Sequence, residues 1–107
     1  MTENLARAHV ERFNAAVTSG DWGPFVAGLH PDAVMSFVGP PVGPWQGREA
    51  IAAAYAADPP DDTIQITGIR SGSDRDLVDF TWSRGGGGTL TLSYRDGQVA
   101  ELIVRFG

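Results

Sequence analysis

The spacing of apolar residues changes once along this 107-residue chain, and the change limits what the chain can fold into. In most of the first 60 residues, apolar side chains recur every three or four positions, which is typical of amphipathic helices. After that they alternate with polar side chains, which is typical of strands with one buried face. Helices followed by a run of strands predict an α+β fold, in which helices pack on one face of a bent sheet.

The first part of the chain predicts two helices and a strand. An apolar stripe runs over residues 3–19, and Gly20 follows as a residue that can end a helix. Asp21 can cap a second, shorter helix that stops before Pro31. Residues 33–38 (AVMSFV) are short and apolar, and they predict the first strand.

The rest of the chain predicts a third helix and four strands. The helix is REAIAAAYAA, and Asp58 with two prolines ends it. The strands, joined by SGSD, GGGG and DG turns, are TIQITGIR, DLVDFTWSR, TLTLSYR and QVAELIVRF. Neither a repeat nor a linker interrupts this order, and the length suffices for one buried core, so we expect a single domain over residues 1–107.

Composition narrows the function classes. The chain has no cysteine, which excludes disulfides and thiolate chemistry, and no histidine spacing typical of metal sites, so we expect neither metal nor cofactor. A net charge of −5 argues against nucleic acid as a partner. No apolar run reaches the ~20 residues that span a bilayer, and the first residues do not resemble a signal peptide. We therefore expect a cytoplasmic protein without a membrane partner.

Residues 37–51, FVGPPVGPWQGREAI, form an unusual connection between a strand and a helix. Their prolines and glycines prevent regular structure. Solvated loops usually carry Ser, Asn or Asp, whereas Phe37, Val42 and Trp45 keep this loop apolar. A stiff apolar loop predicts that it covers a pocket, with Trp45 as a lid.

The order of the predicted elements, together with FNAAVTSGDW, PDAV, GREAIAAAY and GQVAELIVRFG, resembles the nuclear transport factor 2-like superfamily. Within it the chain is similar to the branch of ketosteroid isomerases and SnoaL-like polyketide cyclases. The resemblance spans nearly the whole chain. It implies a cystatin-like cone, in which a strongly bent, mostly antiparallel sheet wraps around three N-terminal helices and leaves an apolar cavity. It also implies a homodimer.

The catalytic residues of ketosteroid isomerase do not carry over to this chain. That enzyme uses an Asp base, while a Tyr and a protonated Asp hold the enolate oxygen. The resemblance places Phe37 at the base and Phe13 at the tyrosine, and puts Thr89, Thr91 or Ser93 at the second acid. None of these side chains can replace an acid or base, so we expect no ketosteroid isomerisation and assign no catalytic residue.

The side chains expected to bind a ligand are mostly apolar. The resemblance and the spacing along helix and strand together give Phe13, Phe37, Trp45, Tyr55, Phe80, Trp82, Arg84, Thr91, Leu102, Val104 and Phe106. Arg84 and Tyr55 would form the polar end of this pocket. The alternatives are that Arg84 reaches solvent at the end of its strand and that the Tyr55 hydroxyl bonds to the backbone.

The position of Thr91 depends on how the glycine turn is built. A two-residue turn at Gly86-Gly87 would place Thr91 opposite Trp82 on the pocket face. A three-residue turn would invert the strand, because a register shift of one residue moves every side chain to the other face. We expect the two-residue turn. It would leave an outward apolar patch that favours a homodimer, consisting of Leu90, Leu92, Tyr94, Val99 and Ile103.

Two functions fit these observations. The first is a pocket protein for a small apolar molecule with a polar or anionic end, either a carrier or a divergent isomerase or cyclase in which Tyr55 or Arg84 polarises a carbonyl. The second is a non-enzymatic dimeric module whose large inward side chains fill the cone. A ligand-sized cavity needs ~300 Å³ or more, so the cavity volume distinguishes the two. We expect the first.

Overall fold

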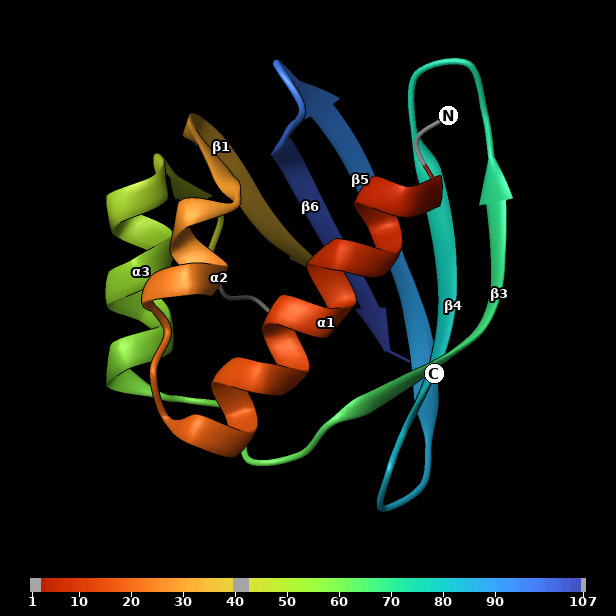
Figure 1. Ribbon diagram of the computed structural model, residues 1–107, viewed down its shortest axis with the longest axis horizontal. Coiled ribbons are helices and arrows are strands. Elements are labelled where there is room, and N and C mark those ends of the chain that lie inside the picture. The colour runs from red at the N-terminus through yellow and green to blue at the C-terminus, as the bar shows by residue number, and fades with distance from the viewer. Residues whose placement is uncertain (1–2, 40–42, 107) are drawn as a thin grey trace.

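The computed structural model describes residues 3–39 and 43–106, so Val42 of the predicted apolar loop lies outside the described residues. Within them, three helices lie on one face of a curved six-stranded sheet (Figure 1). The helices are α1 (Glu3–Ser19), α2 (Gly23–Ala27) and α3 (Arg48–Ala57). The strands are β1 (Leu29–Val38), β2 (Trp45–Gln46), β3 (Ile64–Ser71), β4 (Asp76–Trp82), β5 (Gly87–Arg95) and β6 (Gln98–Phe106). The predicted α+β fold is confirmed.

Helix α1 has the predicted bounds. Its stripe of apolar residues, including Ala6, Val10 and Phe13, is buried against the sheet and the other helices. Gly20 ends the helix in the left-handed region, with a φ of 80°, and its N–H donates to the carbonyl of Ala16 (2.8 Å). Glycine adopts this conformation without the steric cost that a Cβ would add.

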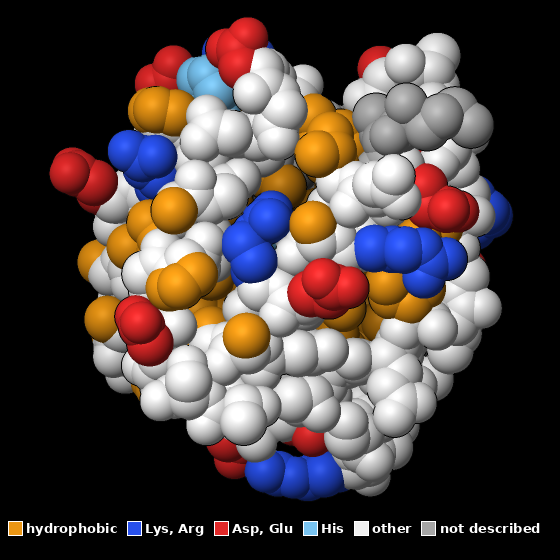
Figure 2. Space-filling view, in the orientation of Figure 1, with side chains coloured by type: hydrophobic (Ala, Val, Ile, Leu, Met, Phe, Trp, Pro, Cys, Tyr) orange, Lys and Arg blue, Asp and Glu red, His pale blue; other side chains and the backbone are white. Residues whose placement is uncertain are grey.

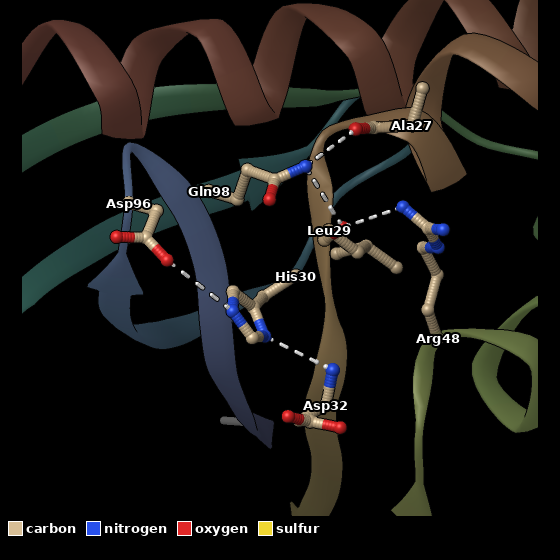
Figure 3. Close-up of polar contacts among 7 residues, drawn as sticks. All are labelled: Ala27, Leu29, His30, Asp32, Arg48, Asp96 and Gln98. Carbon is tan, nitrogen blue, oxygen red and sulfur yellow. Dashed lines mark hydrogen bonds and ion pairs between the residues drawn. The ribbon is translucent and has the colours of Figure 1, made fainter.

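Helix α2 is shorter than predicted, and β1 starts earlier. The helix ends at Ala27 and the strand begins at Leu29. Gln98 Nε2 donates to the carbonyls of Ala27 (3.2 Å) and Leu29 (3.4 Å), and Arg48 Nη1 donates to that of Leu29 (3.4 Å) (Figure 3). Side chains from distant parts of the chain therefore fix this boundary, and local spacing does not reveal it.

His30 lies inside β1. Its side chain is 12% exposed and lies 3.7 Å (Nε2 to Oδ2) from Asp96 at the β5–β6 turn. The N–H of Asp32 donates to His30 Nδ1 (3.0 Å), as Figure 3 shows. The imidazole thus joins the start of β1 to the neighbouring hairpin.

The strand order is β2-β1-β6-β5-β4-β3. Neighbouring strands are antiparallel except β1 and β6, which are parallel. The short strand β2 lies within the loop predicted to be irregular, and it places Trp45 opposite Met35. No helix of the described residues is long and apolar enough to cross a membrane.

The turn between β4 and β5 is not the predicted one. The N–H of Trp82 donates to the carbonyl of Gly86 (2.8 Å), so three residues lie between the two. The predicted two-residue glycine turn is therefore wrong. The turn has three residues, but these are Ser83, Arg84 and Gly85 and not three glycines, and the strand is inverted as expected for a three-residue turn. Thr91 consequently pairs with Leu77 on the outer face and not with Trp82.

The turn between β5 and β6 is the predicted two-residue turn. Asp96 and Gly97 have positive φ values of 55° and 77°, which suit a tight hairpin. A register irregularity follows within the same pair of strands, and beyond it Leu92 lies opposite Leu102. A single extra residue of this kind shifts all pairs beyond it.

These registers overturn the predicted outward patch. Leu90, Leu92 and Val99 are 6%, 0% and 1% exposed, and all three belong to the core. Tyr94 packs against the same core, and its hydroxyl donates to Asp76 (2.7 Å). Of the five residues predicted for the patch, only Ile103 lies in the outer row, where it pairs with Thr91.

Candidate functional site

A partly open cavity of about 510 Å³ lies between the helices and the concave side of the sheet. This volume exceeds the ~300 Å³ that a small ligand needs, so the large inward side chains do not fill the cone. The predicted residues that line the cavity are Phe13, Phe37, Trp45, Tyr55, Phe80, Trp82, Leu102, Val104 and Phe106.

Two predicted members of the site, Arg84 and Thr91, do not line the cavity. Arg84 lies in the β4–β5 turn with its side chain 66% exposed. Its Nη2 donates to the carbonyl of Asp61 (2.7 Å), and its Nη1 lies 3.3 Å from Asp61 Oδ2. Strand alternation does not apply in a turn, which is why the prediction for Arg84 is wrong. Thr91 faces outward because of the register described above.

Aromatic rings build much of the wall. The Phe37 ring, on β1, stacks on Phe106 of β6, with ring centroids 5.7 Å apart and an angle of 9° between the planes. Trp45 meets Phe37 edge-on, with centroids 5.6 Å apart. On the helix side, Trp22 stacks on Tyr55 at 4.7 Å. Strand alternation and the short β2 pairing thus bring Trp45 to the wall of the cavity.

His9 lines the cavity, although the sequence analysis did not assign it to the site. It follows Ala6 by three residues and precedes Phe13 by four, and this helical spacing would have placed it on the buried face. The side chain is 3% exposed. Burial, and secondarily the positive charge of Arg12, lower the pKa of His9 to about 3, so the ring is neutral at pH 7.

The polar groups of His9 and Tyr55 have no partners within the described part of the chain. Nδ1 of His9 is fully covered and unpaired. The Tyr55 side chain is 9% exposed, burial raises its pKa, and neither its hydroxyl nor His9 Nε2 forms a hydrogen bond with residues 3–39 or 43–106. Both rings contact Phe25, each with centroids 5.1 Å apart. Two neutral hydrogen-bonding side chains of the cavity lining therefore contact the same buried phenyl ring.

The charged residues of the lining are both acidic. Asp58 and Asp61 belong to the segment after α3, and both are exposed, which places them at the opening of the cavity. Acidic and basic side chains lie next to each other at the lower end of the view in Figure 2, where this segment and the β4–β5 turn meet (Figure 1). The other lining residues that the sequence analysis missed are Met35, Ala54, Pro59, Pro60, Ile64 and Leu90.

The arrangement suits hydrogen bonding to a polar group on an otherwise apolar molecule. His9 can donate from one ring nitrogen and accept at the other, and Tyr55 can do both through its hydroxyl. Among the described residues, no group of three or more His, Asp or Glu gathers that could hold a metal ion.

A family model for the SnoaL-like domain matches residues 10–102 of the chain. A comparison with curated proteins gives no match. Solved structures with the same fold include an NTF2-like protein from Anabaena variabilis, with a TM-score of 0.77 and 20% identity, which covers 99% of this chain and 89% of that one.

Two further structures are similar over nearly the whole chain. A candidate ketosteroid isomerase from Kribbella flavida has a TM-score of 0.74 and 17% identity, covering 100% of this chain and 81% of that one. The protein TerC, co-crystallised with polyporic acid, has a TM-score of 0.77 and 18% identity, covering 96% of this chain and 92% of that one. These likenesses confirm the predicted nuclear transport factor 2-like fold.

Proposed function

We propose that this chain, which belongs to the SnoaL-like domain family, binds in its cavity a small apolar molecule that carries one polar group. The observation that carries the proposal is the cavity of about 510 Å³, whose apolar wall holds His9 and Tyr55, two side chains without a hydrogen bond to the described residues. Pockets for small molecules typically combine such a wall with a few polar groups that orient the ligand.

The unpaired imidazole supports binding over a purely structural role. A buried polar group without a partner costs about 1–3 kcal/mol of folding free energy. A ligand in the cavity could bond instead to Nε2 of His9, which has no partner among the described residues, whereas a filled apolar core would gain more from leucine at this position. TerC, which shares the fold at 18% identity and was co-crystallised with polyporic acid, gives support at the level of the fold.

The finer proposal of a divergent isomerase or cyclase rests on the same two side chains. Neutral donors such as imidazole and phenol polarise a carbonyl where charge develops during the reaction. Phe13 and Phe37, at the positions of the absent acid–base residues, both lie in the apolar wall. The substrate or a water molecule would therefore supply the base.

The proposal is tested with a cavity-blocking variant and a matched control on the same helix. Ala54 lines the cavity, and its neighbour Ala53 is exposed. Purified protein is extracted with solvent, and the extract is analysed by mass spectrometry. In a second assay, 2-naphthol is titrated into the protein while tryptophan fluorescence is recorded, because Trp45 and Trp82 lie in the cavity wall.

We expect wild type and Ala53→Trp to bind the naphthol and to carry the same extracted molecule. Ala54→Trp should lose both. Equal binding by the two variants, or no binding by wild type together with an empty extract, would contradict the proposal.

A further inference from the structure

The charged residues that line the cavity have one sign. Asp58 and Asp61 line its exposed end, and we call these two residues the acidic rim. No arginine lines the cavity as the structure describes it, and the chain contains no lysine. An anionic group at this opening would find no positive side chain in the wall.

The end of α3 adds to the negative potential of the rim. Asp58 caps this helix, with its N–H donating to the carbonyl of Ala54 (3.1 Å), and the last turn contains no basic residue. The last carbonyls of a helix carry a partial negative charge, which adds to that of the Asp58 carboxylate. Within the described residues, Asp58 forms no ion pair that would offset this charge.

Asp61 is only partly neutralised. Arg84 pairs with it from outside the cavity, and the two side chains are 66% and 84% exposed, so solvent and salt screen the pair. The rim therefore keeps an acidic character.

The aromatic wall of the cavity independently favours a cation over an anion. Indole and phenyl faces attract cations, and Trp45, Trp82 and Phe106 all belong to the wall. His9, which lines the cavity and is 3% exposed, is neutral at pH 7. It provides no positive charge to stabilise an anion.

We infer that the cavity selects apolar ligands that carry a positively charged nitrogen at the rim over anions of the same size. This inference rests on the proposed function, because it names the chemical class of the ligand for that cavity. It replaces the expected anionic end, which depended on Arg84 in the wall.

The experiment compares three probes that share one naphthalene ring: 2-naphthylmethylamine as the ammonium, 2-naphthylmethanol as the neutral analogue, and 2-naphthoate as the anion. Binding is measured by calorimetry at neutral pH and at an ionic strength of about 0.01 M, where screening extends over ~30 Å. We expect the ammonium to bind about threefold to tenfold tighter than the alcohol, and the naphthoate to bind most weakly.

Two variants of equal charge separate the rim from the overall field of the protein. Asp58→Asn should reduce the preference for the ammonium over the alcohol, whose own affinity should not change. Asp74→Asn removes an exposed carboxylate outside the cavity and should leave the ranking intact. Arg84→Ala should strengthen binding of the ammonium, because it leaves Asp61 without its counter-charge.

The outcomes distinguish this inference from the proposed function. Binding of the alcohol without preference for the ammonium, or weaker ammonium binding by Arg84→Ala, overturns the inference and leaves the proposed function standing. The inference is also overturned if Asp74→Asn lowers the preference for the ammonium as much as Asp58→Asn does. If none of the three probes binds, the proposed function fails and the inference fails with it.

Discussion

At the scale of single residues, His9 links the stability of the protein to pH. Its folded-state pKa of about 3 lies below the ordinary value of 6.5 because burial disfavours the charged ring. As pH falls below the ordinary value, the unfolded chain takes up a proton at this residue and the folded chain does not. The contribution of His9 to stability is therefore fully present above the unfolded pKa and is lost as pH falls toward the folded pKa.

We predict that the free energy of unfolding decreases by up to about 1.4 kcal/mol per pH unit between neutral pH and about pH 5 through this residue. Urea unfolding at several pH values measures the slope. His9→Leu should flatten it, and should also raise stability at neutral pH, because the variant removes an unpaired buried group. Ala15→Leu, a non-titrating change at an exposed position of the same helix, is the control and should keep the slope. An unchanged slope in His9→Leu would show that the ring does not remain neutral.

The absence of ketosteroid isomerase activity is a second prediction at this scale. Phe13 and Phe37 line the cavity, and the resemblance to ketosteroid isomerase puts them at two of its catalytic positions. Each acid or base of such a mechanism typically contributes 10²–10⁴-fold to the rate. We expect no measurable conversion of β,γ-unsaturated ketosteroids in a spectrophotometric assay. Turnover within a hundredfold of the ~10 s⁻¹ of a typical enzyme would mean that another residue supplies the base.

The sequence predicted apolar members of the site better than polar ones. Phe80, Trp82 and Tyr55 follow from strand alternation and helical spacing, which depend only on local geometry. Arg84 was misplaced because a turn of unknown length follows β4. His9 was not predicted because histidine was weighed only for metal-ligand spacing, whereas its place in the site follows from its burial on the inner face of α1.

At the scale of elements, the start of β5 shows how a glycine shapes the cavity. Gly88 lies opposite Phe80 on one side and Phe106 on the other. A Cβ built there would contact the carbonyl oxygen of Arg105 and lie 3.0 Å from Cζ of Phe80. The absence of a side chain lets the Phe80 ring lie over the strand as part of the cavity wall.

We predict that Gly88→Ala destabilises the protein by about 1–3 kcal/mol, because the strand or the Phe80 ring must move. The same displacement should weaken ligand binding. Gly68→Ala on β3 is the matched control, since its Cβ would meet only the Asp79 carboxylate, at an ordinary 3.6 Å. Chemical denaturation measures both variants. Equal stability of the two would contradict the close packing at Gly88.

Strand β5 also shows why the pairing register of a strand is harder to predict than the strand itself. The four glycines before Thr89 accommodate turns of different lengths, and their sequence does not choose among them. The choice follows from burial of Leu90 and Leu92 against the helices, which is a tertiary effect. Helix α1 and the β5–β6 turn were predicted correctly because their signals are local.

At the scale of the whole molecule, the order of elements was sufficient for the fold, whereas the cavity volume was not predictable. The order of helices and strands matches the nuclear transport factor 2-like fold over nearly the entire chain. The volume depends on the curvature of the sheet and on rotamers such as the stacking of Phe37 on Phe106. Neither the curvature of the sheet nor the side-chain rotamers can be derived from the spacing of apolar residues.

The predicted homodimer concerns the outer face of the sheet, where the residues differ from those first expected. Leu77, Thr91, Ile103 and Ser36 are successive partners across β4, β5, β6 and β1. Leu77 and Ile103 are only half-buried in the isolated chain. Charged residues of both signs surround this row: Asp79, Glu101 and Arg105. The same residues of a second copy can therefore form ion pairs with them.

We predict that two copies pack these faces together about a two-fold axis, because each copy then covers the Leu77 and Ile103 side chains of the other. Light scattering at micromolar concentration should give the mass of a dimer. Ile103→Arg should give a monomer, because it places a charge within the apolar row of both copies, whereas Ala53→Arg on the exposed side of α3 should remain dimeric. A monomeric wild type would refute the dimer, and a dimeric Ile103→Arg would place the contact on another face.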